Sequence, residues 1–112
     1  MSEDIVPILR VADAQAALAW YERLRFEHVS SHRFAPGLPV FMTVRRGDVH
    51  LFLSEHAGDA NPGGLVYLWV DDVHAVVEEF GTPLSENPWA LDTELVDPDG
   101  NRIRVGQRLD DS

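Results

Sequence analysis

The chain has 112 residues and a formal charge of −10, from 19 acidic residues against 9 basic ones, all of which are arginine. This length fits one domain, and a hydrophobic content of 45% is enough to form a packed core. The acidic balance excludes binding to nucleic-acid phosphates, which depends on basic patches, whereas it would attract a cationic ligand.

The first half of the chain predicts one helix between strands. Asp13 is expected to cap a helix over residues 14–24, whose buried stripe would be Ala17, Leu18, Tyr21 and Leu24. Short apolar, β-branched runs predict strands over residues 5–11, 26–32, 40–45 and 49–53. The last two flank the hairpin turn Arg46-Gly47-Asp48. Residues 57–64, rich in Gly, Asn and Pro, are expected to form a loop.

The second half repeats this pattern. A strand is predicted over residues 65–70, and Asp72 is expected to cap a helix that ends at Gly81. The apolar positions of that helix are Val73, Val76, Val77 and Phe80. A loop with Pro88-Trp89 follows, and strands over 93–96 and 102–105 flank the turn 97–101. The tail from Gln107 onward is polar.

A count along the chain indicates an internal duplication. The two caps, Asp13 and Asp72, lie 59 positions apart, and the helix stripes share this offset. We predict an α+β fold of two tandem βαβββ modules in a single domain, residues 1–112. The modules would span residues 5–56 and 65–107, with a linker at 57–64 and a tail at 108–112. Strand–helix–strand order is also common in unduplicated α+β domains, which is the alternative.

Several short segments make the chain resemble the glyoxalase/bleomycin-resistance/extradiol-dioxygenase superfamily, also called vicinal oxygen chelate proteins. They are residues 6–13, 20–24, 65–70 and 97–101, in that order and spacing. Phe52-Leu53-Ser54 and Pro88-Trp89 are most similar to the bleomycin resistance proteins, although Ala90-Leu91-Asp92 departs from their pattern. The resemblance implies a homodimer with the concave sheets at the interface and ligand grooves there.

The resemblance also implies where a metal would be held. Metal-dependent members place His or Glu at four strand positions that face the cavity, which here are Val6, Phe52, Leu65 and Arg104. Aliphatic, phenyl and guanidinium groups do not coordinate a divalent cation, so we expect no metal and no cofactor. The five histidines, at positions 28, 32, 50, 56 and 74, lack the spacing of a motif such as HExxH. His50 is expected in the groove wall and His74 in solvent.

The candidate nucleophiles and acid–base residues of the chain do not indicate covalent or acid–base catalysis. The chain has no cysteine, which excludes a cysteine nucleophile, thiolate metal sites and disulfides. Ser54 lacks the G-x-S-x-G context of a nucleophile. Asp97 and Asp99 are interpreted as turn-forming residues rather than a general acid and base.

Strand alternation predicts which side chains face away from the helices. The predicted ligand-binding residues on these strands are His50, Phe52, Ser54, Tyr67, Trp69 and Arg104. Trp89, through the Pro-Trp resemblance, and Phe34, through its loop position, are added to them. The alternative for Tyr67 and Trp69 is a place in the dimer core. Arg102 and Arg104 either pair with carboxylates or recognise an acidic group on a ligand.

We therefore expect a non-enzymatic homodimer that binds and sequesters a small aromatic or cationic ligand such as bleomycin. One alternative is a glyoxalase- or dioxygenase-type enzyme of the same superfamily, with an unusual metal or none. Another is a groove that serves only assembly with a further protein. The N-terminus, Met1-Ser2-Glu3-Asp4, is unlike a secretory signal, and no stretch approaches the roughly 20 apolar residues of a membrane span. We expect a cytoplasmic location, with no membrane partner.

Overall fold

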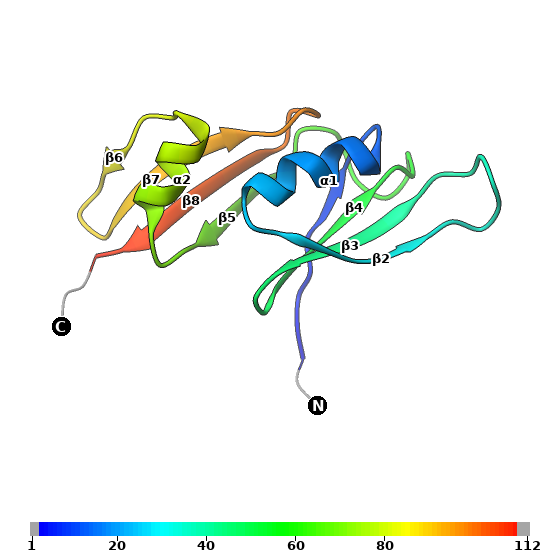
Figure 1. The fold of residues 1–112 in the computed structure, drawn as a ribbon, viewed down its shortest axis with the longest axis horizontal. Coiled ribbons are helices and arrows are strands. Elements are labelled where there is room, and N and C mark those ends of the chain that lie inside the picture. Colours follow the sequence, from blue (N-terminus) through cyan, green and yellow to red (C-terminus); the bar gives the residue numbers. More distant parts are fainter. Residues whose placement is uncertain (1–2, 110–112) are drawn as a thin grey trace.

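The computed structural model describes residues 3–109 as two four-stranded sheets, each packed against one helix (Figure 1). The first module contains β1 (Ile8–Arg10), α1 (Ala14–Arg23), β2 (Glu27–His32), β3 (Phe41–Arg46) and β4 (Val49–Ser54). The second contains β5 (Leu65–Trp69), α2 (Val73–Phe80), β6 (Ser85–Glu86), β7 (Ala90–Val96) and β8 (Arg102–Arg108). The predicted α+β class and the two βαβββ units are confirmed.

The two sheets have the same topology. Their strand orders are β1-β4-β3-β2 and β5-β8-β7-β6, and in each the first and last strands of the module pair in parallel. The other neighbours are antiparallel. The modules lie side by side along the long axis of a molecule that measures 51 × 36 × 21 Å (Figure 1). The identical strand order of the two sheets supports an internal duplication.

Both helices begin at the predicted caps. The Asp13 carboxylate accepts hydrogen bonds from the backbone N–H groups of Gln15 and Ala16, and Asp72 does the same for the first turn of α2. Such bonds satisfy amides that have no partner within the helix. Gly81 ends α2 in the left-handed conformation, at φ 68°, which costs glycine little. Within residues 3–109, neither helix has the length and apolarity required to cross a bilayer.

The helices cover only one face of each sheet. Leu51 and Leu53 of β4 are buried beneath α1, whereas His50 and Phe52, which alternate with them, remain partly exposed. In β8, Ile103 is buried in the same way between two arginine positions. Each module therefore has a packed face and an uncovered face, which we call its open face.

Some predicted boundaries were wrong. β1 begins at Ile8 rather than residue 5, β7 begins at Ala90 rather than 93, and β8 continues to Arg108. β6 precedes the loop that contains Trp89. The extra residues, 90–92 of β7 and 106–108 of β8, do not alternate between apolar and polar in sequence, but they pair with each other across the sheet. Residues 110–112 of the predicted tail lie outside the described residues.

A buried group of hydrogen bonds joins the two modules. Tyr21 of α1 donates its hydroxyl to Asp97 Oδ2 at 2.7 Å, and Asn101 Nδ2 donates to the carbonyl oxygen of Arg10 at 2.9 Å. Asp97 also accepts from the backbone N–H groups of Asp99 and Asn101, as expected of a turn-forming residue. Burial, and then the nearby Asp97 charge, raise the pKa of Tyr21, so the phenol stays protonated and donates.

Candidate functional site

Aromatic side chains meet on the open face of the first sheet. The rings of Phe41 and Phe52 lie 4.9 Å apart between centroids, and Phe52 pairs in register with Ile8 of β1. His50, two residues before Phe52, donates from Nδ1 to the carbonyl oxygen of Asp48 over 3.2 Å. This face therefore offers flat apolar surface with one imidazole at its edge.

The open face of the second sheet combines aromatic rings with arginines. Tyr67 and Trp69 of β5 have ring centroids 4.8 Å apart, and the Arg108 guanidinium carbon lies 4.2 Å from the centre of the Trp69 ring. The Tyr67 hydroxyl donates to Asp92 Oδ2 at 3.2 Å, across β8. Planar surface and charged groups are thus held next to each other.

Gly106 is what allows the Tyr67 ring to lie across β8. A Cβ at this position would stand 2.8 Å from Tyr67 Cζ and 2.9 Å from Tyr67 Cε1, which is closer than non-bonded carbon atoms approach each other. We expect Gly106→Ala to displace the ring, weaken its bond to Asp92 and cost about 1 kcal/mol of unfolding free energy. Urea unfolding and the Tyr67 ring NMR signals measure this. The control is Gly58→Ala, where an added Cβ meets nothing within 4 Å; equal effects would contradict the expectation.

Arg102 and Arg104 share one carboxylate. Arg102 donates through Nε and Nη2 to Glu94 at 3.1 and 2.9 Å, and Arg104 Nε donates to the same residue at 3.1 Å. These hydrogen bonds lower the pKa of Glu94 from 4.5 to about 2. Of the two alternatives left by the sequence, pairing with a carboxylate is present, and both guanidiniums remain accessible to a ligand.

The shifted Glu94 pKa predicts a specific pH dependence. Because the pKa is lowered in the folded state, the stabilisation from this cluster is present above about pH 4.5 and is lost as the pH falls towards 2. We expect the Glu94 side-chain carboxyl carbon to titrate near pH 2 by NMR. In Arg102→Gln its pKa should rise towards 4.5. An unchanged midpoint in that variant would show that Arg102 does not hold the charge.

A small cavity of about 290 Å³ opens where the two modules meet. Its wall combines the N-terminal segment, the start of β4 and the middle of β5, with His50 and Tyr67 among the lining residues. These two predicted ligand-binding residues, from different modules, are therefore brought together. The fold places a mostly apolar recess beside the exposed aromatic surface.

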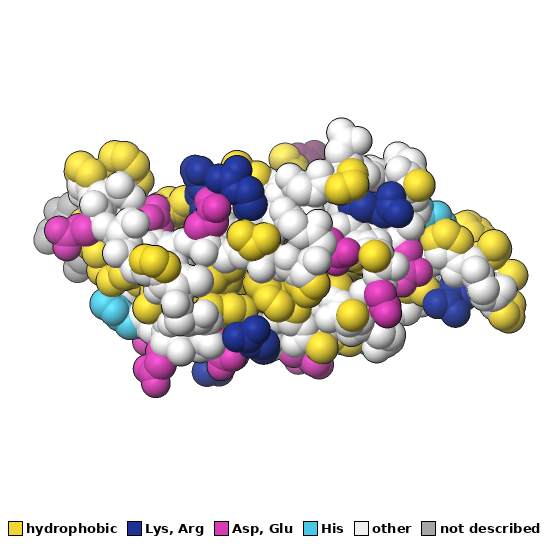
Figure 2. All heavy atoms as spheres, turned by 90° about the horizontal axis from the view of Figure 1, so that it is seen from above, with side chains coloured by type: hydrophobic (Ala, Val, Ile, Leu, Met, Phe, Trp, Pro, Cys, Tyr) yellow, Lys and Arg dark blue, Asp and Glu magenta, His cyan; other side chains and the backbone are white. Residues whose placement is uncertain are grey.

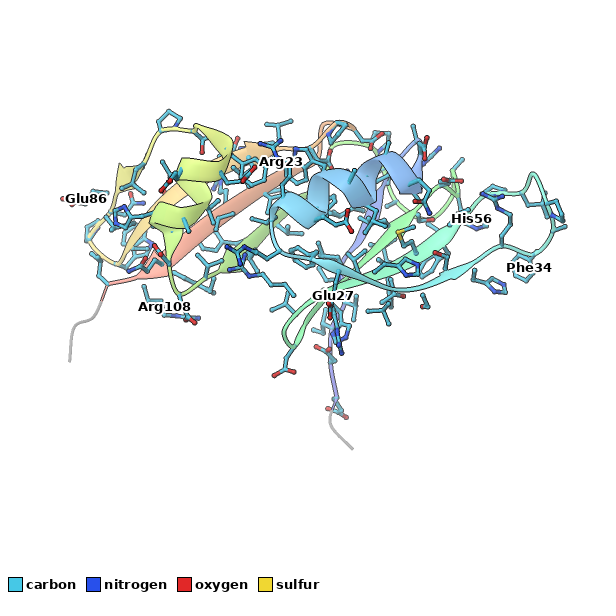
Figure 3. The ribbon with its side chains drawn as sticks, viewed as in Figure 1. Arg23, Glu27, Phe34, His56, Glu86 and Arg108 are labelled. Carbon is cyan, nitrogen blue, oxygen red and sulfur yellow. The ribbon has the colours of Figure 1, made fainter. Side chains whose placement is uncertain are left out.

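One predicted site residue, Ser54, is not on the open face, and two others, Phe34 and Trp89, lie far apart within one chain. Ser54 is fully buried, and its hydroxyl donates to Asp59 Oδ2 at 2.6 Å, so it is not on open surface. Phe34 is 77% exposed at one end of the molecule, whereas Trp89, 64% exposed, follows β6 at the opposite end (Figures 1 and 3). One chain cannot bring Phe34 and Trp89 onto the same small ligand.

The four positions compared with a metal site do not fit a divalent cation. Phe52 and Arg104 lie on the open faces. In the sheet register Phe52 stands opposite Ile8 and Arg104 stands opposite Tyr67, so Val6 and Leu65 are not their direct partners. None of these side chains is a His, Asp or Glu. Over residues 3–109, no group of three or more His, Cys, Asp or Glu is arranged to hold a metal ion.

Four residues of the open faces were not predicted from sequence, because their place depends on strand register. They are Arg10, Asp92, Glu94 and Arg108, which stand opposite or alternate with residues on those faces.

A wide recess of about 960 Å³ on the helix side, between the ends of α1 and α2, was not predicted either. There Arg23 Nε pairs with Glu79 Oε2 at 2.9 Å and Arg46 donates to the Leu24 carbonyl. Burial lowers the pKa of Arg46, and the charge of Arg25 lowers it further.

Two sheets of identical order, each open on one side, define a paired βαβββ protein of the vicinal oxygen chelate fold. The chain belongs to the glyoxalase superfamily, because the family model described as "Glyoxalase superfamily protein" matches residues 1–112. A search of curated proteins returns no match.

Solved structures agree with this fold. A bleomycin-binding protein complexed with bleomycin is 24% identical, with a TM-score of 0.70 over 96% of this chain and 100% of that one. TnmS3, an antibiotic binding protein from Streptomyces sp. CB03234, is 24% identical, with a TM-score of 0.77 over 97% and 99% of the two chains. A bleomycin resistance determinant encoded on the transposon Tn5 is 25% identical, with a TM-score of 0.68 over 96% and 98%.

Proposed function

We propose that the protein binds and sequesters a small aromatic molecule of the antibiotic kind without converting it, and bleomycin is the first ligand to test. The observation that carries this proposal is the pair of aromatic clusters, Phe41 with Phe52 and Tyr67 with Trp69, on otherwise uncovered sheet faces. Support comes from the antibiotic-binding relatives of the same fold. Flat rings with a few polar groups suit a planar ligand.

We also propose that the binding unit is a homodimer in which the open faces of two copies meet. Leu65, Tyr67 and Trp69 are 50%, 40% and 38% exposed on one face, an unusual apolar area for a small monomer. A two-fold arrangement that sets the first module of one copy against the second module of the other would bring Phe34 near Trp89. Analytical ultracentrifugation should give about twice the chain mass of 12.5 kDa. A stable monomer would contradict this arrangement.

Sequestration acts through mass action rather than chemistry. A ligand that binds only the folded protein lowers its own free concentration and raises the midpoint of thermal unfolding. No nucleophile, metal or proton transfer is required of the groove. The side chains on the open faces need only contact the rings and satisfy the polar groups of the ligand.

Calorimetric titration with bleomycin tests the proposal. We expect about one site per groove, and Trp89→Ala should weaken binding by more than about 1 kcal/mol, as is typical of a stacked aromatic residue. The control is Trp20→Phe, on the helix side, where Trp20 packs against Phe80; it should leave the affinity unchanged. The absence of heat at micromolar ligand would count against sequestration of bleomycin.

Elemental analysis separates this proposal from an enzyme of the same superfamily. Protein purified without chelators should contain no stoichiometric Zn, Ni, Fe or Mn, because the four compared positions lack suitable ligands. One metal ion per chain, together with its loss on mutation of His50, would instead support a metal-dependent activity.

A further inference from the structure

The open faces collect positive charge in a strongly acidic protein. Five of the nine arginines occupy open-face strand positions: Arg10, Arg45, Arg102, Arg104 and Arg108. Of the 19 acidic residues, three occupy such positions within residues 3–109: Glu27, Asp92 and Glu94. On the surface seen in Figure 2, by contrast, acidic and basic side chains lie intermixed. The net charge of the open-face strands is therefore opposite to that of the chain.

The arginines of β8 stand in a row. Arg102, Arg104 and Arg108 alternate onto the open face, with Gly106 at the position where the Tyr67 ring crosses the strand. Glu94 supplies one negative charge to Arg102 and Arg104 together. Arg104 uses only Nε in that pair, so its two terminal amino groups have no hydrogen-bond partner among residues 3–109. A planar fork of this kind matches an oxyanion.

We propose that the groove takes an aromatic ligand that carries an acidic group, such as a carboxylate, sulfonate or phosphate. The rings lie on Tyr67 and Trp69, and the acidic group contacts the guanidiniums of Arg102 and Arg104. This inference rests on the proposed function and narrows its ligand class. It replaces the expectation of a cationic ligand, because the groups at contact distance are cations, whereas the acidic surface acts over longer range.

Three pyrene derivatives that differ only in their end group test the inference. They are the acid pyrene-1-butyrate, the alcohol 1-pyrenebutanol and the amine 1-pyrenebutylamine. Fluorescence anisotropy measures their dissociation constants. We expect the acid to bind about tenfold more tightly than the alcohol or better, from charge-assisted hydrogen bonds, and the amine to bind most weakly. Only the affinity of the acid should fall steeply with added salt.

Variants assign the effect to the arginine row. Arg104→Met should remove most of the preference for the acid and leave the alcohol affinity nearly unchanged, and Arg102→Met provides a second test. The matched control is Arg23→Met, because Arg23 is an equally accessible arginine on the helix side, paired with Glu79; it should change neither affinity.

The outcomes separate the two proposals. If the alcohol or the amine binds as tightly as the acid, or if bleomycin binds and the acid does not, the ligand class proposed here is wrong while sequestration stands. If neither bleomycin nor any of the three probes binds, sequestration itself fails. An acid preference that survives in both Arg104→Met and Arg102→Met would also overturn the assignment.

Discussion

Asp97→Ala is expected to lower the free energy of unfolding by about 3–5 kcal/mol, because the charged acceptor of four hydrogen bonds is lost. Those bonds come from the Tyr21 hydroxyl, the side chain and backbone of Asn101, and the backbone of Asp99. The change leaves the Tyr21 hydroxyl buried without its partner and loosens the turn between β7 and β8. Urea denaturation followed by circular dichroism measures the loss.

A milder variant calibrates this result. Tyr21→Phe removes one bond of the same group and keeps the ring packing against Phe26, so a loss of about 1–2 kcal/mol is expected. If Asp97→Ala cost no more than Tyr21→Phe, the remaining bonds of Asp97 would contribute nothing to stability. The hydrogen bonds of Asp97 would then not hold the junction between the modules together.

Glu55→Ala is expected to cost about 2–3 kcal/mol, because one carboxylate serves two separate elements. Glu55 Oε2 accepts from the backbone N–H of Ala14, in the first turn of α1, at 2.8 Å. Its Oε1 accepts from the N–H of Val40, just before β3, at 3.0 Å. A negative charge at the start of α1 also interacts favourably with the helix dipole.

Glu55→Gln separates geometry from charge. The amide keeps one oxygen acceptor but loses the charge and the second acceptor, so an intermediate loss of stability is expected. Hydrogen exchange of the Ala14 and Val40 amides should quicken in Glu55→Ala. Unchanged exchange at both amides would contradict the dual role.

The elements with local signals were predictable from sequence. Asp13 and Asp72 mark the helix starts because a capping side chain bonds to amides only two or three residues away. Strand alternation likewise predicted the faces of His50 and Phe52, since a side chain's direction in a strand follows from its neighbours. These features need no knowledge of the distant parts of the chain.

The features that failed depend on distant partners. Arg108 looked like tail sequence, but it pairs with Ala90, 18 positions earlier, as the last step of the β7–β8 ladder. Ser54 has the correct parity for the open face, yet Asp59 of the loop folds back over it and accepts its hydroxyl. The row of arginines became visible only when strand register placed them on one surface.

The duplicated topology places chemically unlike residues at corresponding positions of the two sheets. Phe52 in the first sheet corresponds to Arg104 in the second, and Ser54 corresponds to Gly106. An elongated guest lying across both sheets would therefore meet one hydrocarbon end and one guanidinium end, and could settle in only one direction. In a two-fold assembly, two such guests would point opposite ways, head to tail.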